Sequence, residues 1–281
     1  MMNEINLHKS NLDKNGFIHV KNFFSDGEIE ILRNYAIKTL DTDKENIVDV
    51  LSINEIQDVL LSDKFLSFIK RLMGENKTTY FGNSSIFYGK SLGLNNFHID
   101  ARNDDESYSV DYPIYRVAIY LQNHKNFSGG IKFRLKSHKK LLIRLYPIHE
   151  LIKTLKKFVK NSFPIKDIFF RGRICNMRSE KNDLIIWNMR THHAGRFKLF
   201  KFFPSIAINP FIERILPNFL FRKEEKKRFA YFIAFSKNQE EQFNLFYKDN
   251  LERHKNQINN SKYLTDKKIL QKLSQHNISV R

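Results

Sequence analysis

The chain has 281 residues, of which 41% are hydrophobic and 14% aromatic, so it can bury a substantial core. With 10 glycines and 6 prolines, it is neither a low-complexity nor a disordered chain. The one cysteine, Cys175, excludes an intramolecular disulfide framework and any metal site built from several cysteines. No run approaches the roughly 18 apolar residues of a membrane span, and the first residues lack the apolar core of a signal peptide. We therefore expect a cytoplasmic protein without a transmembrane segment.

The composition is strongly basic, because 48 Lys and Arg against 30 Asp and Glu give a formal net charge of +18. One explanation is codon bias, because AT-rich codons supply Lys, Asn, Ile and Phe, in which the chain is rich. The other is an anionic partner, such as a nucleic acid, a membrane surface or a phosphorylated substrate. Acidic residues are concentrated before about residue 111, and basic residues in 132–182 and 196–228.

The first third of the chain carries helix signals. Three capping patterns mark predicted helix starts: Ser25 with Glu28, Ser52 with Glu55, and Ser62. Gly74 is expected to end the third helix, because glycine is common just after a helix C-terminus. Before these helices, residues 16–20 form a short apolar run that is typical of a strand.

From residue 79 the apolar period changes from helical spacing to two, which is the period of strands. The predicted strands are 79–90, 115–121, 130–135, 184–191 and 229–235. The long segments between them favour a sandwich or jelly roll over repeated βαβ units. We expect one domain, 1–281, with a helical segment 1–78, a β core 79–236 containing a helical insert at about 140–172, and a helical tail 237–281.

The helical insert has two interpretations. Residues 149–160 carry apolar side chains on one face and four lysines largely elsewhere. Such a helix either packs on the sheet with its lysines in solvent, or lies on a membrane or over a basic pocket.

The most informative motif is His98-Ile99-Asp100. On a strand, residues i and i+2 point to the same face, so this motif places an imidazole and a carboxylate side by side. Two histidines and one carboxylate form the facial triad that holds non-haem Fe(II). The motif therefore supplies two of the three ligands, and the third is expected from a distant strand.

Residues 183–195 offer two histidines for that third position. If the strand continues through this segment, Trp187 and His193 share the apolar face, and His192 lies on the opposite face. Alternation thus predicts that His193 points inward and His192 outward. The alternative without a metal site is that His192 is a surface residue and that His193 is a hydrogen-bonded residue of the core.

Several segments of the chain occur in the order seen in one enzyme family. They are 15–20 (Asn-Gly-Phe-Ile-His-Val), 97–100 (Phe-His-Ile-Asp), 128–131 (Ser-Gly-Gly-Ile), 137–139 (Ser-His-Lys) and 183–195. Over about residues 12–235 the chain resembles the phytanoyl-CoA dioxygenase family of Fe(II)/2-oxoglutarate oxygenases. The resemblance implies a double-stranded β-helix, a mainly β fold with flanking helices of the α+β class.

The resemblance also implies a set of ligands and cosubstrates. It implies iron ligands at His98, Asp100 and His193, with 2-oxoglutarate and O2 as cosubstrates, and usually hydroxylation of an aliphatic carbon. Related halogenases carry a small residue at the carboxylate position, so Asp100 favours hydroxylation, desaturation or ring chemistry. The substrate is expected to be a small molecule, and the basic segments beside the predicted strands favour an anionic one.

The distal carboxylate of 2-oxoglutarate needs a cation, for which the planar fork of arginine is well suited. In the family this arginine begins the strand after the distal histidine, and Arg228 opens such a strand. It lies farther from His193 than is common in the family, so Lys198 and Lys201 remain alternatives. A simpler interpretation is that Arg228 is one more base of a basic run.

Three further residues are candidates for the pocket. Lys90 stands near the position of a family lysine and is expected to bind cosubstrate or substrate, with a solvated strand end as its alternative. Arg116 and Tyr120 lie on a strand beside the expected site, but alternation does not decide whether they reach it.

The function that these patterns favour is an Fe(II)/2-oxoglutarate-dependent dioxygenase. The alternative is a non-catalytic jelly-roll protein that binds a polyanion or an anionic membrane surface, because a fold does not fix a function. No specific nucleic-acid partner is expected, since the sequence has no zinc-finger, RRM-type or clear helix-turn-helix signature.

Overall fold

The computed structural model describes most of the N-terminal half and the strands of the C-terminal half. The described residues are 2–39, 45–47, 49–74, 78–89, 97–100, 114–123, 130–139, 173–195, 200–203, 216–221, 228–237, 244 and 266–280. The predicted helix at 149–160 lies outside them. No helix in the described part is long and apolar enough to cross a membrane.

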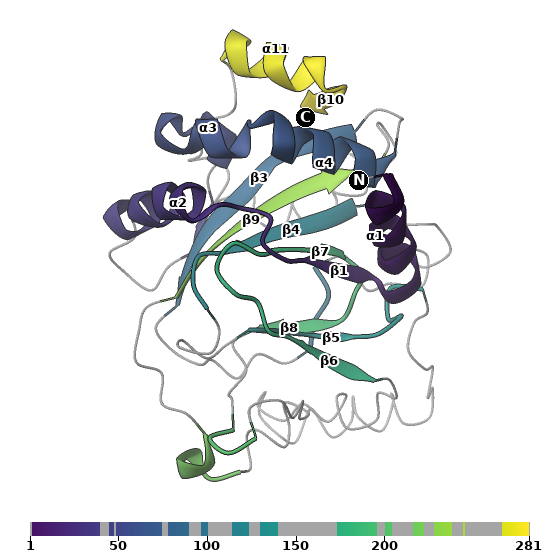
Figure 1. Ribbon diagram of the computed structural model, residues 1–281, viewed down its shortest axis with the longest axis vertical. Helices are drawn as coiled ribbons and strands as arrows, with labels where there is room; N and C mark the ends of the chain where they lie inside the picture. Colours follow the sequence, from purple (N-terminus) through teal and green to yellow (C-terminus); the bar gives the residue numbers. More distant parts are fainter. Residues whose placement is uncertain are drawn as a thin grey trace.

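Two stacked sheets form the centre of the molecule (Figure 1). The larger sheet has the order β1-β7-β4-β9-β3-β10, with β2 also paired to β3. Its strands are β1 (Phe17–Val20), β2 (Glu45–Ile47), β3 (Thr78–Gly89), β4 (Ile114–Tyr120), β7 (Leu184–Asn188), β9 (Arg228–Ser236) and β10 (Ile278–Val280). The smaller sheet has the order β6-β5-β8, with β5 (Ile131–Arg134), β6 (Ile174–Met177) and β8 (His193–Gly195). All pairings are antiparallel except that of β10 with β3.

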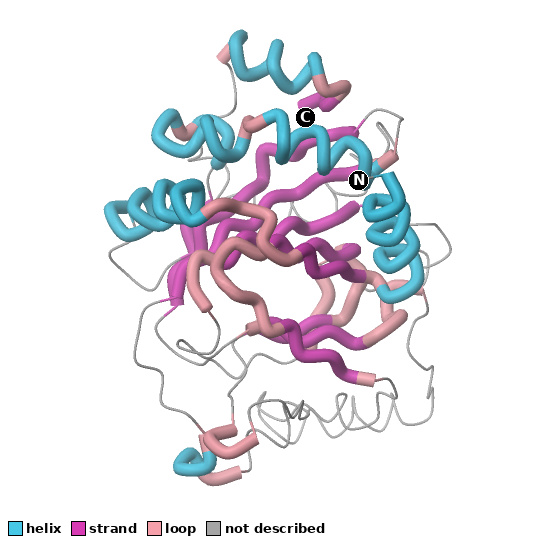
Figure 2. The backbone as a smooth tube through the Cα atoms, viewed as in Figure 1, coloured by secondary structure: helices cyan, strands magenta, loops and turns pink. Residues whose placement is uncertain are grey.

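Helices cover the face of the larger sheet that is turned away from the smaller one (Figure 2). The helices are α1 (Met2–Asn15), α2 (Asp26–Thr39), α3 (Gln57–Leu60), α4 (Asp63–Met73) and α11 (Lys267–Gln275). Short 3₁₀ turns are η1 (Val50–Ser52), η2 (Asn54–Ile56) and η4 (Asn218–Leu220). This arrangement confirms the predicted α+β class.

The caps show where local sequence decided the helix ends. The Ser25 hydroxyl accepts from the amide of Glu28 at 3.2 Å and the Glu28 carboxylate accepts from the amide of Ser25 at 2.7 Å, so this predicted capping box is confirmed. Ser62 caps α4 and Gly74, with φ of 110°, ends it, also as predicted.

The predicted cap at Ser52 is wrong. The chain there forms two 3₁₀ turns before α3, and the Ser52 hydroxyl donates to the carbonyl of Asp49 at 2.6 Å. Asp49 itself caps the first turn, and its buried carboxylate also accepts from the hydroxyl of Tyr80 at 2.5 Å. A buried tertiary hydrogen bond therefore determined the local structure here more strongly than the local pattern did.

Strands β1, β7, β4 and β9 of the larger sheet divide their side chains between two cores. Val117 and Ile119 of β4 pack in the outer core between the sheet and the helices. Ala118 and Tyr120 of the same strand pack in the inner core between the two sheets. The candidate site residues lie on this inner face.

Five of the described helices and strands were not individually predicted from the sequence: α1, β2, β6, β8 and β10. The C-terminal segment contains the helix α11, and it also returns as β10 to pair with the edge strand β3. Register partners Ile278 and Thr78 are two hundred residues apart in sequence, so only the tertiary structure brings them together.

Candidate active site

The His98-Ile99-Asp100 segment is extended but is not part of a long strand. His98 forms an isolated antiparallel bridge with His193. The amide of each donates to the carbonyl of the other, with an N-to-O distance of 2.9 Å for both hydrogen bonds. The amide of Asp100 donates to the carbonyl of Met189 at 2.9 Å. Two backbone anchors on the segment after β7 thus hold the motif against β8.

A further contact holds the start of this segment on the smaller sheet. The guanidinium carbon of Arg134 lies 4.3 Å from the ring centroid of Phe97. This distance is within the range of a cation–π interaction. The packing of Phe97 therefore fixes the chain immediately before His98.

The structure brings the three predicted ligands together. One ligand atom from each of His98, Asp100 and His193 lies within 4.8 Å of the others. Oδ1 of Asp100 is 4.0 Å from Nε2 of His98 and 3.6 Å from Nε2 of His193. The two imidazole rings have centroids 4.3 Å apart.

The backbone fixes the tautomer of His193. Its Nδ1 lies 2.9 Å from the carbonyl oxygen of Thr191, which can only accept, so Nδ1 carries the proton and Nε2 presents a lone pair to Asp100 and His98. Burial lowers the pKa of His193 to about 4, although the Asp100 carboxylate opposes this shift. The imidazole is therefore neutral at pH 7, which is the form that binds metal.

The turn that carries Thr191 rests on the N-terminal segment. Gly16 has a φ of 87°, and its carbonyl oxygen accepts from the hydroxyl of Thr191 at 2.7 Å and from the amide of Asn188 at 2.9 Å. A Cβ at Gly16 would lie 2.6 Å from the Thr191 hydroxyl and 2.4 Å from Nδ1 of His138. Only glycine fits this close approach in a left-handed conformation.

The alternation argument for residues 184–193 is wrong in its premise. The strand ends at Asn188, whose carbonyl accepts from the amide of Thr191 at 2.7 Å and whose side chain accepts from the amide of Arg190 at 2.9 Å. This Asx-type turn carries the chain from the larger sheet to the smaller one. His192 is therefore buried as well, at 8% exposure, rather than outward on the surface.

The environment of His192 differs from that of His193. Burial, together with the nearby charge of Arg134, lowers the pKa of His192 to about 4. His192 belongs to no group of three metal-ligand side chains among the residues that the structure describes. His192 is therefore a buried histidine next to His193 that can serve as a control for it.

Arg116 holds the other oxygen of the Asp100 carboxylate. Its Nε lies 3.6 Å from Oδ2, so Oδ1 is left facing the two histidines. Burial raises the pKa of Asp100, but His193, Arg116 and His98 outweigh burial and keep this pKa below its ordinary value. The carboxylate is consequently charged at neutral pH.

The three ligands open into a cavity of about 200 Å³ between the sheets. Its walls combine a few polar groups with apolar side chains, as small-molecule sites usually do. The lining residues are Phe87, His98, Asp100, Arg116, Tyr120, Ile131, Trp187, His193, Gly195, Arg228 and Phe232.

Arg228 begins β9 and points into this cavity at 6% exposure. Its guanidinium carbon lies 6.0 Å from the ring centroid of Phe87. Burial raises the pKa of Tyr120 to about 12, while Arg228 pulls in the opposite direction. Tyr120 is therefore a neutral hydroxyl at pH 7 within the electrostatic reach of Arg228.

The remaining sequence candidates are placed differently. Arg116 and Tyr120 both line the cavity, which alternation had left undecided. Lys90 and Lys198 lie outside the described residues. Lys201 is exposed and is absent from the described cavity walls.

Sequence reasoning missed the apolar side of the cavity. Phe87, Ile131 and Phe232 line it, and Phe232 shares the face of Arg228 because their positions on β9 differ by four, an even number. Alternation from Arg228 was the signal for Phe232. Nothing local indicated that Phe87 or Ile131 lines the cavity, because both come from other strands.

The fold is shared with solved structures of non-haem iron enzymes. HygX from Streptomyces hygroscopicus with iron bound is 13% identical, covers 82% of this chain and 85% of its own, and has a TM-score of 0.56. The epimerase SnoN in complex with Fe3+, alpha ketoglutarate and nogalamycin RO is 11% identical (83% and 84% covered, TM-score 0.52). The alpha ketoglutarate dependent carbocyclase SnoK from nogalamycin biosynthesis is 12% identical (82% and 83%, TM-score 0.51).

No family model matches the sequence, and no curated protein matches it. At these identities the structural likeness establishes the fold alone. That fold is the double-stranded β-helix of Fe/2-oxoglutarate enzymes, as the sequence resemblance predicted.

Proposed function

We propose that the protein is an Fe(II)- and 2-oxoglutarate-dependent oxygenase. The observation that carries this proposal is the convergence of His98, Asp100 and His193 at the wall of an inner cavity. The fold shared with HygX, SnoN and SnoK supports it independently of the residues.

The donor set fits Fe(II). Two neutral imidazoles and one carboxylate are the ligands that non-haem iron prefers, and other metals would favour different sets. The Nε2 and Oδ1 atoms are 3.6–4.0 Å apart, so a modest rotation of the side chains reaches metal–ligand bonds of about 2 Å. The contact of Thr191 with His193 and that of Arg116 with Asp100 orient two ligands from outside, as supporting groups of metal sites do.

Iron bound with 2-oxoglutarate would supply the oxidising power, by coupling oxidative decarboxylation of the cosubstrate to oxidation of a substrate. The chain's own task is to bind and orient. Arg228 is suited to the distal carboxylate of 2-oxoglutarate, because its planar fork binds a carboxylate bidentately and its charge is shielded from water. Tyr120 supplies a neutral hydroxyl beside it.

The apolar walls have a separate role. Trp187, buried at 2% exposure, lies with its ring centroid 5.2 Å from that of His193, and Phe232 packs 6.2 Å from Trp187. These rings keep water from the interior side of the ligands. A water-excluded pocket strengthens the electrostatic interactions inside it and limits side reactions.

For the substrate we propose a small molecule oxidised at an aliphatic carbon, and an anionic one in particular. The support for this choice is that the basic segments 132–182 and 196–228 flank the cavity strands in the sequence. Paired turnover of acidic compounds and their neutral esters tests this choice. Equal turnover of both forms would remove its support.

The test of the site is an anaerobic titration of the apoprotein with Fe(II) and 2-oxoglutarate, followed by visible absorption. We expect a charge-transfer band in the wild type and none in His193→Ala. The matched control is His192→Ala, which removes a buried histidine one residue away and is expected to keep the band.

Two results would contradict the proposal. One is an absent band in folded wild-type protein, which would favour a non-catalytic jelly-roll protein. The other is equal loss in both variants, which would show that the signal follows packing of the turn rather than the ligand set.

A further inference from the structure

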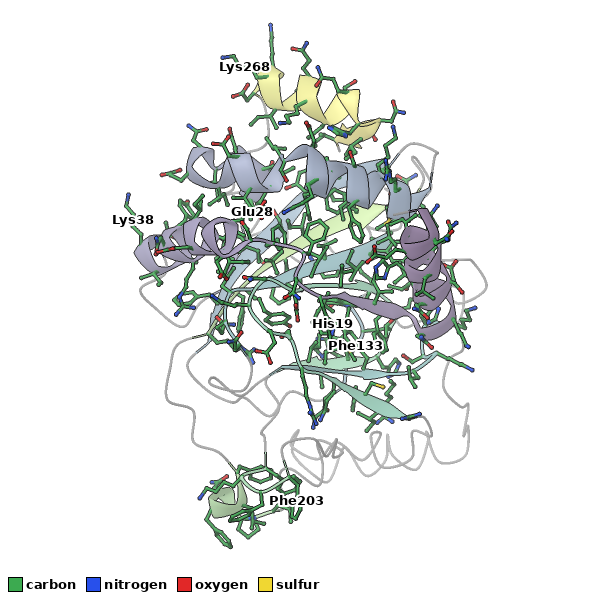
Figure 3. The ribbon with its side chains drawn as sticks, viewed as in Figure 1. His19, Glu28, Lys38, Phe133, Phe203 and Lys268 are labelled. Atoms are coloured by element: carbon green, nitrogen blue, oxygen red, sulfur yellow. The ribbon has the colours of Figure 1, made fainter. Side chains whose placement is uncertain are left out.

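A second feature lies away from the cavity, at the end of the molecule opposite α11 (Figure 3). We call residues 200–203 and 216–221 the aromatic tip. Five of these ten residues are phenylalanine, and the others are two Leu, one Pro, one Asn and one Lys. Phe203 marks the tip in Figure 3, well separated from His19 and Phe133 of the sheets.

The base of the tip is a defined structure. Phe200 and Phe221 form an antiparallel bridge, and their rings stack with centroids 5.0 Å apart and planes at 20°. The amide of Lys201 donates to the carbonyl of Leu220 at 3.0 Å. The two arms of the tip are therefore held together by backbone and ring contacts.

The end of the tip exposes its largest apolar side chains. Phe202, Phe203 and Phe219 are 78%, 62% and 70% exposed. The other exposed large apolar side chains of the described part are single residues on helices, at 36–59%: Leu7, Ile31, Ile37 and Leu270. Clustered exposed apolar side chains mark an interaction surface, whereas scattered ones are ordinary.

The charge around the tip selects the kind of partner. Lys201 is the one charged residue of the described tip, and it is exposed. Residues 196–228, which include the tip, contain nine basic and three acidic residues, and the whole chain carries +18. This charge attracts anionic surfaces and repels a second copy of the chain.

We propose that the aromatic tip docks the protein on the surface of an anionic lipid bilayer. Phe202, Phe203 and Phe219 enter the boundary between headgroups and acyl chains, and Lys201 meets the anionic headgroups. Exposed apolar side chains with a cation beside them, in a segment whose sequence is basic, are typical of interfacial membrane segments. Single-strand nucleic-acid sites instead alternate stacking rings with cations along a groove, and the described tip has one cation only.

The chain connects the tip to the cavity on both sides. Gly195 and Arg228 line the cavity, and the tip occupies the sequence between them. Five residue steps separate Gly195 from Phe200, so their Cα atoms are at most about 18 Å apart. A docked tip would therefore hold the cavity close to the bilayer. This proposal does not depend on the iron site.

The test is co-sedimentation of the full chain with vesicles of one part phosphatidylglycerol to two parts phosphatidylcholine. We expect the wild type to pellet with these vesicles and to partition more weakly into phosphatidylcholine alone. The variant Phe202→Ser/Phe203→Ser/Phe219→Ser should lose more than about tenfold in partitioning, because it removes three apolar insertions. The control Ile31→Ser/Ile37→Ser removes exposed apolar side chains from α2 and should pellet as the wild type does.

A second measurement guards against misfolding of the triple variant. The single variant Phe202→Trp adds one exposed indole, whereas the native Trp187 is buried. We expect a blue-shifted emission on the anionic vesicles and quenching by brominated lipid. Metal titration of the triple variant, with an unchanged charge-transfer band, keeps this outcome separate from failure of the iron site.

Three results would overturn the proposal. The first is a wild type that stays in the supernatant or a triple variant that pellets equally well. The second is a wild type that is dimeric in light scattering and a triple variant that is monomeric, which would assign the tip to a second copy. The third is tip-dependent binding of single-stranded oligonucleotide without vesicle binding, which would assign it to nucleic acid.

Discussion

The two faces of the larger sheet serve different purposes. On the outer face, β4 and β9 present apolar side chains to the helices, and Phe65 of α4 is fully buried among them. On the inner face, the same strands present Arg116, Tyr120 and Arg228 to the cavity. One strand thus contributes to stability with one set of alternate residues and to the candidate chemistry with the other.

This difference teaches where charge is tolerated. Arg116 is partly buried beside the Asp100 carboxylate, and Arg228 is buried beside the Phe87 ring, so each lies next to a group that compensates its charge. The outer core buries Asp49, but with hydrogen bonds from Tyr80 and from the amide of Leu51. Both regions therefore hold polar groups, but only those of the inner face converge on a cavity.

The largest effect is expected for Phe65→Ala in the outer core. Phe65 packs against Phe24 and Phe235, so removing its ring leaves a cavity that should cost about 3–5 kcal/mol of unfolding free energy. Urea denaturation measures this loss. Below the unfolding transition, the Fe(II) and 2-oxoglutarate titration should match that of the wild type. An altered titration in the folded variant would show that the two faces are not separable.

A smaller effect on stability, but a specific effect on metal, is expected for Arg116→Gln. Without the guanidinium on Oδ2, the Asp100 carboxylate loses its fixed orientation, and Fe(II) affinity should fall about 10–100-fold. Metal titration without 2-oxoglutarate isolates this effect. If only the affinity for 2-oxoglutarate falls, Arg116 binds the cosubstrate rather than positioning the ligand.

The smallest effect concerns pH and a hydrogen-bonded carboxylate at the edge of the larger sheet. Asp183 accepts from His19 at 2.6 Å and from the amides of Asn22 and Glu180. Burial raises the pKa of Asp183, but these hydrogen bonds outweigh burial and lower the pKa below its ordinary value. Because the folded-state pKa is the lower one, the stabilisation is present above the unfolded-state pKa of about 3.9 and is lost as pH falls through the folded value.

The variant Asp183→Asn should therefore differ from the wild type in stability only above this pH range. We expect it to be less stable by about 1 kcal/mol at pH 7, the usual net contribution of a hydrogen bond, and to approach the wild type below about pH 4. Thermal unfolding across pH measures both values. A stability difference that persists unchanged at low pH would mean that the carboxylate contributes by packing rather than by charge.

Local sequence determined the elements whose signals are local. The capping box at Ser25 and Glu28, the cap at Ser62 and the period-two runs behind β3, β4, β7 and β9 were all predicted, because each depends on contacts within a few residues. The sequence also showed the residue types of the three candidate metal ligands and the order of the motifs that carry the family resemblance. Through the family resemblance, they indicated the double-stranded β-helix.

Only the tertiary structure decided how distant segments meet. The turn at Asn188, the anchoring of the Asp100 amide on Met189 and the pairing of β10 with β3 depend on partners that no local pattern specifies. His193 came to the predicted position through a turn between sheets rather than through strand alternation. The physical reason is that hydrogen bonds and packing across the sheets outweigh local preference once the chain is folded.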